Sequence, residues 1–553
     1  MFDIPKRFNL KKKSLPVAPL TLNGYALIPP KNPPTANSWG TWLQNQPAPY
    51  FKPGNRLYPL TTYLYGARQE YALALDQAER WGYALNIGYG RDYPITYADA
   101  ATTNPVTNDG KLLRKAIINP MKYSVAGVVL QGYPSTSQAP EGYLRDSGGT
   151  VISSDWSPEA TPASIGVAVA ERMDALRKLK ALGVNISVVY DGGETGLHPP
   201  GANAQSFYGR DPRVLAAKGN LSWPDYISQR KGMQTKRFAE EVAALLPDRK
   251  VYGFYTALAN PYSTIPGVED SGWDYKYMQY ACDVPTGSVY YKDFFANKAG
   301  MTNPQITDRA YSDQLSHFRS AVTEQINIFK KPISYNFVSA GYKHIDPAGD
   351  PTGAAAEVAG QPNPYYMSIG AYKGFLKCMY ALGSAGHVAG YFSNDVAYGD
   401  SSYTPYNPNS VPHWLLQQTS LSDVHARFSW FEDFIFEGDL VPSPSTDNLK
   451  PNLPSYEYPT YTLQAGFYIR NSARAFVRKL RGYDRWLIVL CTPELVNGNP
   501  GSDLDVVLKD LAAVGPLILK SRGIGSIYTV ALDQGKVTKQ HEDFDDGAAS
   551  GAG

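Results

Sequence analysis

Between residues 61 and 438 the sequence alternates between short apolar runs and longer segments with helical spacing. The clearest helical segment is 160–182, where Val167, Ala170 and Met173 recur on one face of a helix. The apolar run 184–191 that follows has the length and β-branched content of a buried strand. Strands separated by helices pair in parallel, because a parallel connection needs a crossover of a dozen or more residues. This rhythm therefore predicts a mixed α/β fold with a parallel sheet.

The alternation yields about eight strand–helix units, which is the number in a (β/α)8 TIM barrel. The expected strands are 63–66, 83–89, 125–132, 184–191, 251–257, 287–291, 333–338 and 387–393. The expected helices are 67–81, 111–121, 160–182, 226–246, 312–329, 364–382 and 412–436. A doubly wound open sheet is the competing fold, but no glycine-rich phosphate loop supports it.

The regions before and after this alternation differ from it in amino-acid composition. Residues 1–60 are rich in proline and asparagine, which predicts an extended N-terminal arm over the barrel of 61–438. Prolines and serines in 439–459 predict a linker, and short strands follow in 460–545. We expect these strands, at 475–480, 485–491, 504–508, 516–520 and 526–531, to form a small all-β sandwich. The last residues, 546–553, are expected to be a flexible tail.

The composition excludes several classes of partner. The chain has 52 basic and 50 acidic residues, so bulk charge favours neither nucleic acid nor an anionic membrane surface. No stretch approaches the roughly 18 apolar residues of a membrane span. Tyrosine is in excess, with 41 residues against 20 phenylalanines, and tyrosine suits both sugar-binding clefts and subunit contacts.

The cysteines and histidines indicate no cofactor. Cys282, Cys378 and Cys491 are far apart in apolar contexts, so we expect buried free thiols rather than disulfides. The seven histidines show no metal-ligand spacing, and we expect neither a metal nor an organic cofactor.

The N-terminus carries basic residues without an apolar stretch after them, so it does not have the pattern of a secretory signal. We expect an extracellular or virion-associated protein that lost a signal or leaves its cell by another route, such as lysis.

The strand 184–191 ends in the sequence Asp191-Gly-Gly-Glu194. A carboxylate at the C-terminal end of a barrel strand, followed by a loop, is where such barrels place catalytic groups. The alternative is that Asp191-Gly192-Gly193 is only a turn that ends the strand.

Other expected strands also have a polar residue near the C-terminal end. Alternation of side chains along a strand predicts that one polar residue of each strand faces inward near its C-terminal end. The expected inward residues are Asn86, Gln131, Asp191, Asn336 and Asp395. Their convergence would form a polar basin, which a purely structural barrel does not need.

Two carboxylates from distant strands suit the hydrolysis of a glycosidic bond. One acid protonates the leaving oxygen, while the other attacks the anomeric carbon or activates water. We expect Glu194 or Asp191 to be the general acid and Asp395 to be the nucleophile or base, although Asp395 could also belong to a turn.

Aromatic and charged residues beside the strand ends complete the expected site. Tyrosines and tryptophans such as Trp156 could stack on sugar rings, and charged residues could bind hydroxyl, sulfate or carboxylate groups. The residues expected to bind substrate are Asn86, Arg91, Asp92, Gln131, Tyr133, Tyr190, Tyr255, Asn336 and Tyr391.

At the level of architecture, the chain resembles the TIM-barrel glycoside hydrolases of the retaining type that carry a C-terminal β-sandwich. The resemblance covers roughly residues 60–540. It rests on "VVYDGGE" at one strand end, "GYFSND" at a late one, and the stretch "FVRKLRGYDRWLIVLCTP" after the barrel. It implies a glycosidase that acts on a polysaccharide.

A second hypothesis is a non-catalytic structural protein, such as a virion or cell-surface component, built on a hydrolase-like barrel. This hypothesis is favoured by the N-terminal arm, by the excess of tyrosine and by the low content of charged residues, which is 18%. In that case we expect a homo-oligomer or larger assembly formed through the N-terminal arm.

Overall fold

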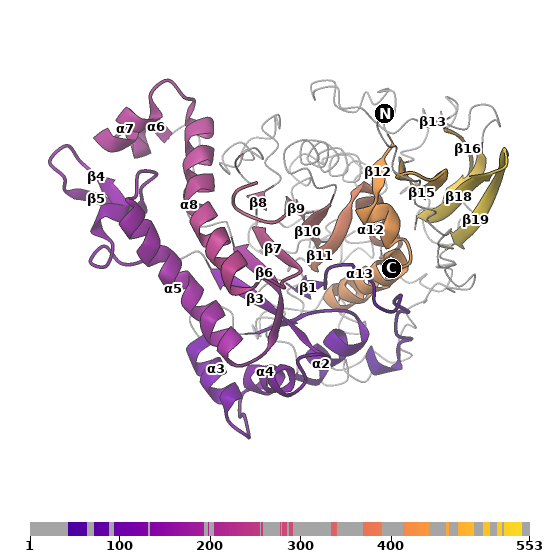
Figure 1. Ribbon diagram of the computed structural model, residues 1–553, viewed down its shortest axis with the longest axis horizontal. Helices are drawn as coiled ribbons and strands as arrows, with labels where there is room; N and C mark the ends of the chain where they lie inside the picture. Colours follow the sequence, from indigo (N-terminus) through magenta and orange to yellow (C-terminus); the bar gives the residue numbers. More distant parts are fainter. Residues whose placement is uncertain are drawn as a thin grey trace, which may run out of the picture.

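A computed structural model describes residues 43–62, 71–87, 93–130, 133–192, 197, 204–254, 256–257, 277, 279–284, 287–290, 333–339, 369–389, 413–441, 461–463, 474–491, 502–508, 517–521 and 525–544. The described chain is a mixed α/β protein, as the alternation predicts. Apart from one antiparallel hairpin within residues 143–156, parallel strands and helices alternate up to residue 436, and antiparallel strands follow them (Figure 1).

The parallel strands form two sheets. The first has the order β2-β3-β6-β7, formed by β2 (Leu85–Asn86), β3 (Ser124–Leu130), β6 (Asn185–Gly192) and β7 (Val251–Phe254). The second has the order β1-β11-β10-β9-β8, formed by β1 (Thr61–Thr62), β11 (Ser384–Ala389), β10 (Ser334–Ser339), β9 (Gly287–Tyr290) and β8 (Thr256–Ala257). A parallel bridge between Leu60 and Tyr83 links the chain just before β1 to the chain just before β2.

Helices lie between these strands. They are α2 (Tyr71–Arg80), α3 (Tyr93–Ala101), α4 (Asn108–Ile118), α5 (Pro162–Ala181), α6 (Ala204–Tyr208), α7 (Pro212–Lys218), α8 (Trp223–Leu245), α12 (Ile369–Leu382), α13 (His413–Ser429) and α14 (Glu432–Phe436). The long helices α5 and α8 run side by side (Figure 1). Each begins with a hydroxyl cap and a proline in its first turn: Thr161 accepts from the Ser164 N–H, and Ser222 accepts from the Asp225 N–H.

Several boundaries differ from the sequence expectation. Strand β11 begins at Ser384 rather than 387, because Gly383 adopts a φ of 118° and lets the chain leave α12 directly into the strand. The expected helix 412–436 is interrupted at Trp430–Phe431. Helix α3 and the antiparallel hairpin of β4 (Tyr143–Arg145) and β5 (Val151–Trp156) were not predicted. Residues 63–66 and the expected helix 312–329 lie outside the described residues.

The side chains of β6 that point toward the other sheet are not those that regular alternation along the strand predicts. The rings of Tyr190 on β6 and Phe337 on β10 are 4.6 Å apart, although the two strands are not neighbours in either sheet. Val189 instead packs in a cluster with Leu176 of α5 and Phe238 of α8. The register between β6 and β3 shifts at this point: Val125 pairs with Ile186, but the next residue of β3, Ala126, pairs with Val188. The extra residue in β6 exchanges the two faces on which its following side chains lie. The two faces of β6 therefore do not follow the regular alternation that the sequence predicts.

Asn336 also occupies a different face from the expected one. It is fully buried, and its amide donates to the Ser334 hydroxyl at 2.6 Å and to the Ser384 hydroxyl at 3.1 Å. Its register partner on β11 is His387, whose ring meets the ring of Tyr380 on the covering helix α12. Since Phe337 on the opposite face contacts Tyr190, Asn336 belongs to the layer between strands and helices, and its inward assignment was wrong.

Two buried histidines share this layer. The hydroxyl of Tyr380 lies 2.6 Å from Nδ1 of His425 on α13, and the ring of Tyr380 contacts His387 edge-on at 4.9 Å. Burial lowers the pKa of each histidine to about 3, so both are neutral at physiological pH.

The C-terminal region consists of two antiparallel sheets. The larger has the order β12-β14-β15-β18-β19, formed by β12 (Gly438–Leu440), β14 (Arg474–Leu480), β15 (Arg485–Cys491), β18 (Ser526–Asp533) and β19 (Lys536–Phe544). The smaller contains β13 (Tyr461–Leu463), β16 (Ser502–Leu508) and β17 (Leu517–Ser521). Leu519 of β17 packs in one apolar cluster with Trp486 and Tyr528 of the larger sheet.

The opposite face of the larger sheet packs on the helices. Phe476, Leu487 and Val489 belong to the same core cluster as Phe375 and Met379 of α12. The three cysteines, Cys282, Cys378 and Cys491, are free and buried, as expected.

Arg478 of β14 connects the sheet to two helix ends. It is fully buried, and its guanidinium donates to the carbonyls of Ala381, Phe434, Ile435 and Gly438 at 2.6–3.2 Å. These carbonyls lie at or just beyond the C-terminal ends of α12 and α14, where a helix carries partial negative charge. Desolvation lowers the pKa of Arg478 to about 10, which still leaves it charged at neutral pH.

The segment 43–60 packs on α14. Lys52 pairs with the buried carboxylate of Glu432 at 2.6 Å, and Arg56 pairs with Asp433 at 2.5 Å and Glu437 at 2.8 Å. This part of the expected arm therefore covers the helical layer, and residues 1–42 lie outside the described residues.

Candidate functional site

A pocket lies beyond the carboxyl ends of β3 and β6, between α5 and α8. Its cavity volume is about 30 Å³, and it is partly open to solvent. It is lined by Tyr133, Trp156, Ile165, Ala168, Val169, Arg172, Leu197, Lys231, Gln234 and Thr235. Tyr133 follows β3 and Leu197 follows β6, so the pocket lies at the end of the parallel sheet where α/β folds bind ligands.

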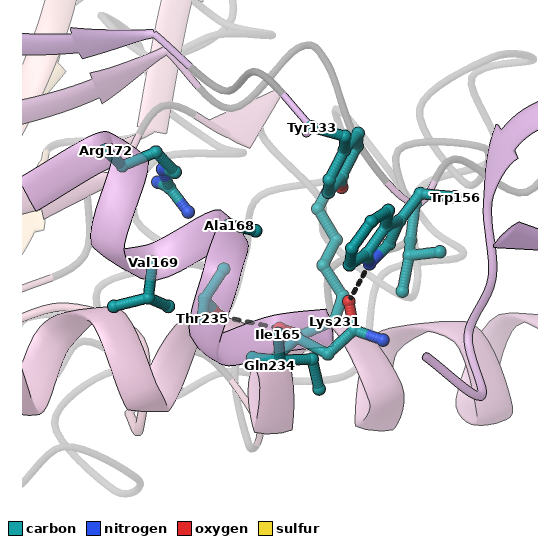
Figure 2. A pocket seen from close by; sticks show the side chains of 10 residues that line it. Tyr133, Trp156, Ile165, Ala168, Val169, Arg172, Lys231, Gln234 and Thr235 are labelled. Carbon is teal, nitrogen blue, oxygen red and sulfur yellow. Dashed lines mark hydrogen bonds between the residues drawn. The ribbon is translucent and has the colours of Figure 1, made fainter. Parts of the chain in front are cut away.

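A stacked aromatic pair forms one wall of this pocket. The rings of Tyr133 and Trp156 are 4.5 Å apart and within 10° of parallel (Figure 2). Trp156 is only 4% exposed, because Tyr143 packs against its edge at 5.4 Å and Gly142 lies against its ring. Tyr133 is partly exposed. Trp156 therefore supports Tyr133 from behind, and Tyr133 carries the contact surface.

Gln234 of α8 fixes the position of Trp156. Its side-chain oxygen accepts from the indole N–H of Trp156 at 3.0 Å (Figure 2). Its amide nitrogen donates to the carbonyls of Ser157 at 3.1 Å and Pro158 at 3.0 Å. One side chain thus holds both the ring and the turn that follows it.

Two cationic residues line the same pocket from the two helices. Lys231 of α8 is 3% exposed, and Arg172 of α5 lies over the ring of Phe238 at 4.0 Å. Figure 2 shows Arg172 directed from α5 toward the space beside the aromatic pair. None of the described lining residues is acidic, so their formal charge is positive.

Glu159, just before α5, is engaged elsewhere. It accepts from the Tyr226 hydroxyl at 2.7 Å and pairs with Arg230 at 2.7 Å. Burial raises the pKa of the Tyr226 phenol well above its usual value, so this group remains protonated and neutral.

The described residues expected to bind substrate have different positions. Tyr133 lines the pocket. Asn86 stands between Leu85 and Ile87, which pack in the cluster with Leu176 of α5 and Phe238 of α8, and its amide donates to the Thr62 carbonyl at 2.5 Å. Tyr190 is 2% exposed against Phe337 and does not line the pocket.

The side chains of the expected carboxylates lie outside the described part of the chain. Asp191 occupies the next-to-last position of β6, and its side chain lies outside the described part. Glu194 and Asp395 also lie outside the described residues, as do Arg91, Asp92, Gln131, Tyr255 and Tyr391.

Sequence reasoning overlooked Arg172, Lys231 and Gln234. Lys231 had a detectable signal, because it stands four residues from Ile227 and from Thr235, on the stripe of α8 that also carries Phe238 and Val242. A charged residue on the apolar stripe of a helix indicates a polar site or a paired charge.

Two further searches concern the described part of the chain alone. No helix there is both long and apolar enough to cross a bilayer. No three histidine, cysteine, aspartate or glutamate side chains gather there in a way that could hold a metal ion.

No protein-family model and no curated protein sequence matches the chain. Among solved structures, the chain is similar to a β-galactosidase from the psychrophilic Marinomonas ef1, with 10% identity and a TM-score of 0.41 over 66% of this chain and 59% of the galactosidase. It is also similar to an α-amylase from Lactobacillus plantarum, with 11% identity and a TM-score of 0.40 over 86% of this chain and 98% of the amylase.

A GH36 α-galactosidase from Geobacillus stearothermophilus shows 11% identity and a TM-score of 0.39, over 91% of this chain and 58% of that enzyme. The chain spans less than two thirds of the length of both galactosidases.

Proposed function

We propose that the protein hydrolyses glycosidic bonds in a polysaccharide, at the carboxyl ends of its parallel strands. The observation that carries this proposal is the partly exposed ring of Tyr133, backed by Trp156, in a pocket at that end of β3 and β6. A flat ring held rigidly beside a pocket binds the apolar face of a sugar at little cost in conformational entropy.

The fold proposed for this function is a closed (β/α)8 barrel with a C-terminal β-sandwich. The two parallel sheets would be two arcs of one barrel, joined by the Leu60–Tyr83 bridge and by the passage from β7 to β8. The contact between Tyr190 and Phe337 supports this arrangement, because it would cross the barrel interior. The cluster around Leu519 supports packing of the two antiparallel sheets as a sandwich.

The proposed chemistry uses two carboxylates. Asp191 or Glu194, at the end of β6, would protonate the leaving oxygen, and Asp395 would attack the anomeric carbon or activate water. Strand β6 ends at Gly192, so both candidate acids are within two residues of its carboxyl end. This end is also the one from which the chain reaches Leu197 in the pocket wall.

Kinetics on a panel of polysaccharides, with detection of new reducing ends, tests this function. We expect Asp395→Asn and one of Asp191→Asn and Glu194→Gln to lower kcat by roughly a thousandfold or more, as loss of an essential acid or nucleophile does. Tyr133→Ala should chiefly raise KM. The control Glu240→Gln removes an exposed carboxylate of α8 that lies outside the pocket and should leave the rate unchanged.

Sugar release that survives all three carboxylate substitutions would reject the proposed mechanism. A protein that releases no sugar from any substrate, yet forms a defined oligomer by light scattering, would favour the structural alternative.

A further inference from the structure

A second stacked aromatic pair lies at the surface, outside the pocket. The rings of Tyr50, in the segment 43–60, and Trp430, between α13 and α14, are 5.4 Å apart and within 25° of parallel. The indole N–H of Trp430 donates to the Tyr50 carbonyl at 3.0 Å. Neither residue lines the pocket between α5 and α8. The proposed function therefore makes no use of this pair.

The two rings differ in their exposure. Trp430 is partly buried and packs against the apolar cluster that contains Phe428 and Phe431. Tyr50 is 49% exposed, although one face of its ring lies on Trp430. The accessible area of Tyr50 must therefore come mainly from the edge and the opposite face of its ring.

The backbone beside both rings is held in place. The N–H of Lys52 donates to the Ser429 hydroxyl at 2.8 Å, and its ammonium group pairs with the carboxylate of Glu432 at 2.6 Å. Lys52 is two residues from Tyr50, and Ser429 directly precedes Trp430. A ring that is already ordered loses little conformational entropy when a ligand binds to it.

The surroundings of Tyr50 are polar. Among the described side chains of 43–62 and 413–441, Tyr50 is the only large hydrophobic one that is exposed. The exposed charged groups of Arg56 and Glu437 belong to the same two segments. A protein partner usually covers a contiguous apolar patch of several hundred Å², which one ring does not supply. A sugar needs one flat apolar face for its C–H groups and polar neighbours for its hydroxyls.

We propose that the exposed face of Tyr50 binds a pyranose ring of a polysaccharide, as a second carbohydrate site outside the pocket. Trp430 supports the tyrosine ring from behind, as Trp156 supports Tyr133 in the pocket. The choice of a sugar as the ligand rests on the proposed function, whereas the site itself takes no part in hydrolysis.

Retention of the full chain on insoluble polysaccharides tests this site, with cellulose, chitin and starch granules as the probes. We expect at least one probe to bind the protein. Tyr50→Leu should weaken that binding about fivefold or more, because leucine keeps apolar volume but has no flat ring. Tyr50→Phe should retain it. The matched control is Tyr483→Leu, which removes a tyrosine that is 41% exposed between β14 and β15 and should leave binding unchanged.

Three results overturn the surface site: retention on none of the probes, retention that Tyr50→Leu leaves unchanged, and an equal loss in Tyr483→Leu. An oligomer that Tyr50→Leu converts to a monomer by light scattering, without binding to any probe, also overturns it and assigns Tyr50 to a contact between copies of the chain.

Hydrolysis of a short soluble oligosaccharide separates this inference from the proposed function. Tyr50→Leu should leave kcat/KM unchanged on such a substrate, whereas Tyr133→Ala should lower it. Retention that depends on Tyr50, without sugar release from any substrate, supports the surface site and rejects the hydrolase. Sugar release together with retention that does not depend on Tyr50 rejects the surface site and supports the hydrolase.

Discussion

Replacing Arg478 with methionine should uncouple the C-terminal sheet from the helical layer. Methionine fills much of the space but leaves the four carbonyl acceptors of Arg478 without their donor inside the protein. Each buried acceptor left unsatisfied costs about 1–3 kcal/mol, and removal of the costly buried charge offsets part of the sum. We expect a net loss of about 3–5 kcal/mol.

Calorimetry of the full chain measures this loss as a fall in Tm. At roughly 2 °C per kcal/mol for a large cooperative unit, we expect a fall of at least about 5 °C. Arg481→Met is the matched control, because Arg481 pairs with Asp439 at 2.8 Å while both side chains are about half exposed or more. That exposed pair should contribute less than about 1 kcal/mol.

A second readout is cleavage by a protease between residues 442 and 460, which should become faster in Arg478→Met if the sheet separates from α12. Equal melting temperatures for Arg478→Met and the wild type would refute the reasoning. So would an equal fall in the Arg481→Met control.

Three further predictions concern the buried histidines and the pocket wall. His387 and His425 have pKa values of about 3 when folded, against 6.5 for an ordinary histidine, so the unfolded chain binds more protons between these values. Stability should thus fall as the pH drops from about 6.5 toward 3, by up to about 1.4 kcal/mol per pH unit for each histidine. Denaturant titrations at several pH values measure this slope, and His425→Gln should reduce it. A free energy of unfolding that does not change over this pH range would contradict the prediction. Gly142→Ala would place a Cβ 2.3 Å from the Trp156 ring, and we expect it to displace that ring and change the near-ultraviolet circular dichroism. Gln234→Ala should weaken saccharide binding by several-fold through Trp156 while α8 stays folded; unchanged affinity would argue against its positioning role.

The alternation of strands and helices was predictable because apolar residues recur at different spacings in the two kinds of element. The strand at 287–291 and the helix at 160–182 agree closely with β9 and α5. The faces of the strands were less predictable. Parity along β6 fails where its register with β3 shifts, because one extra residue exchanges the two faces and a sequence carries no direct mark of it.

The candidate site was predictable only in part. Tyr133 could be inferred because it follows an apolar strand, at the end where α/β folds bind ligands. Asn336 looked like a site residue, but in a buried strand an amide can equally bond to hydroxyls such as that of Ser384 on the next strand. Arg172 and Lys231 were missed because their common pocket depends on how α5 packs beside α8, a long-range relation that helical spacing does not encode.

The edge strand β12 has a consequence for how this protein could be divided. It follows α14 without an intervening loop and pairs with β14, so the chain enters the C-terminal sheet before it leaves the helical layer. A cut in the linker would leave β12 on one fragment and its partner strand on the other, and would strip α12 of its apolar cover. The two halves are therefore not exchangeable modules. Recombination or domain swapping with another protein would succeed only if α12, α14 and the sheet were transferred together.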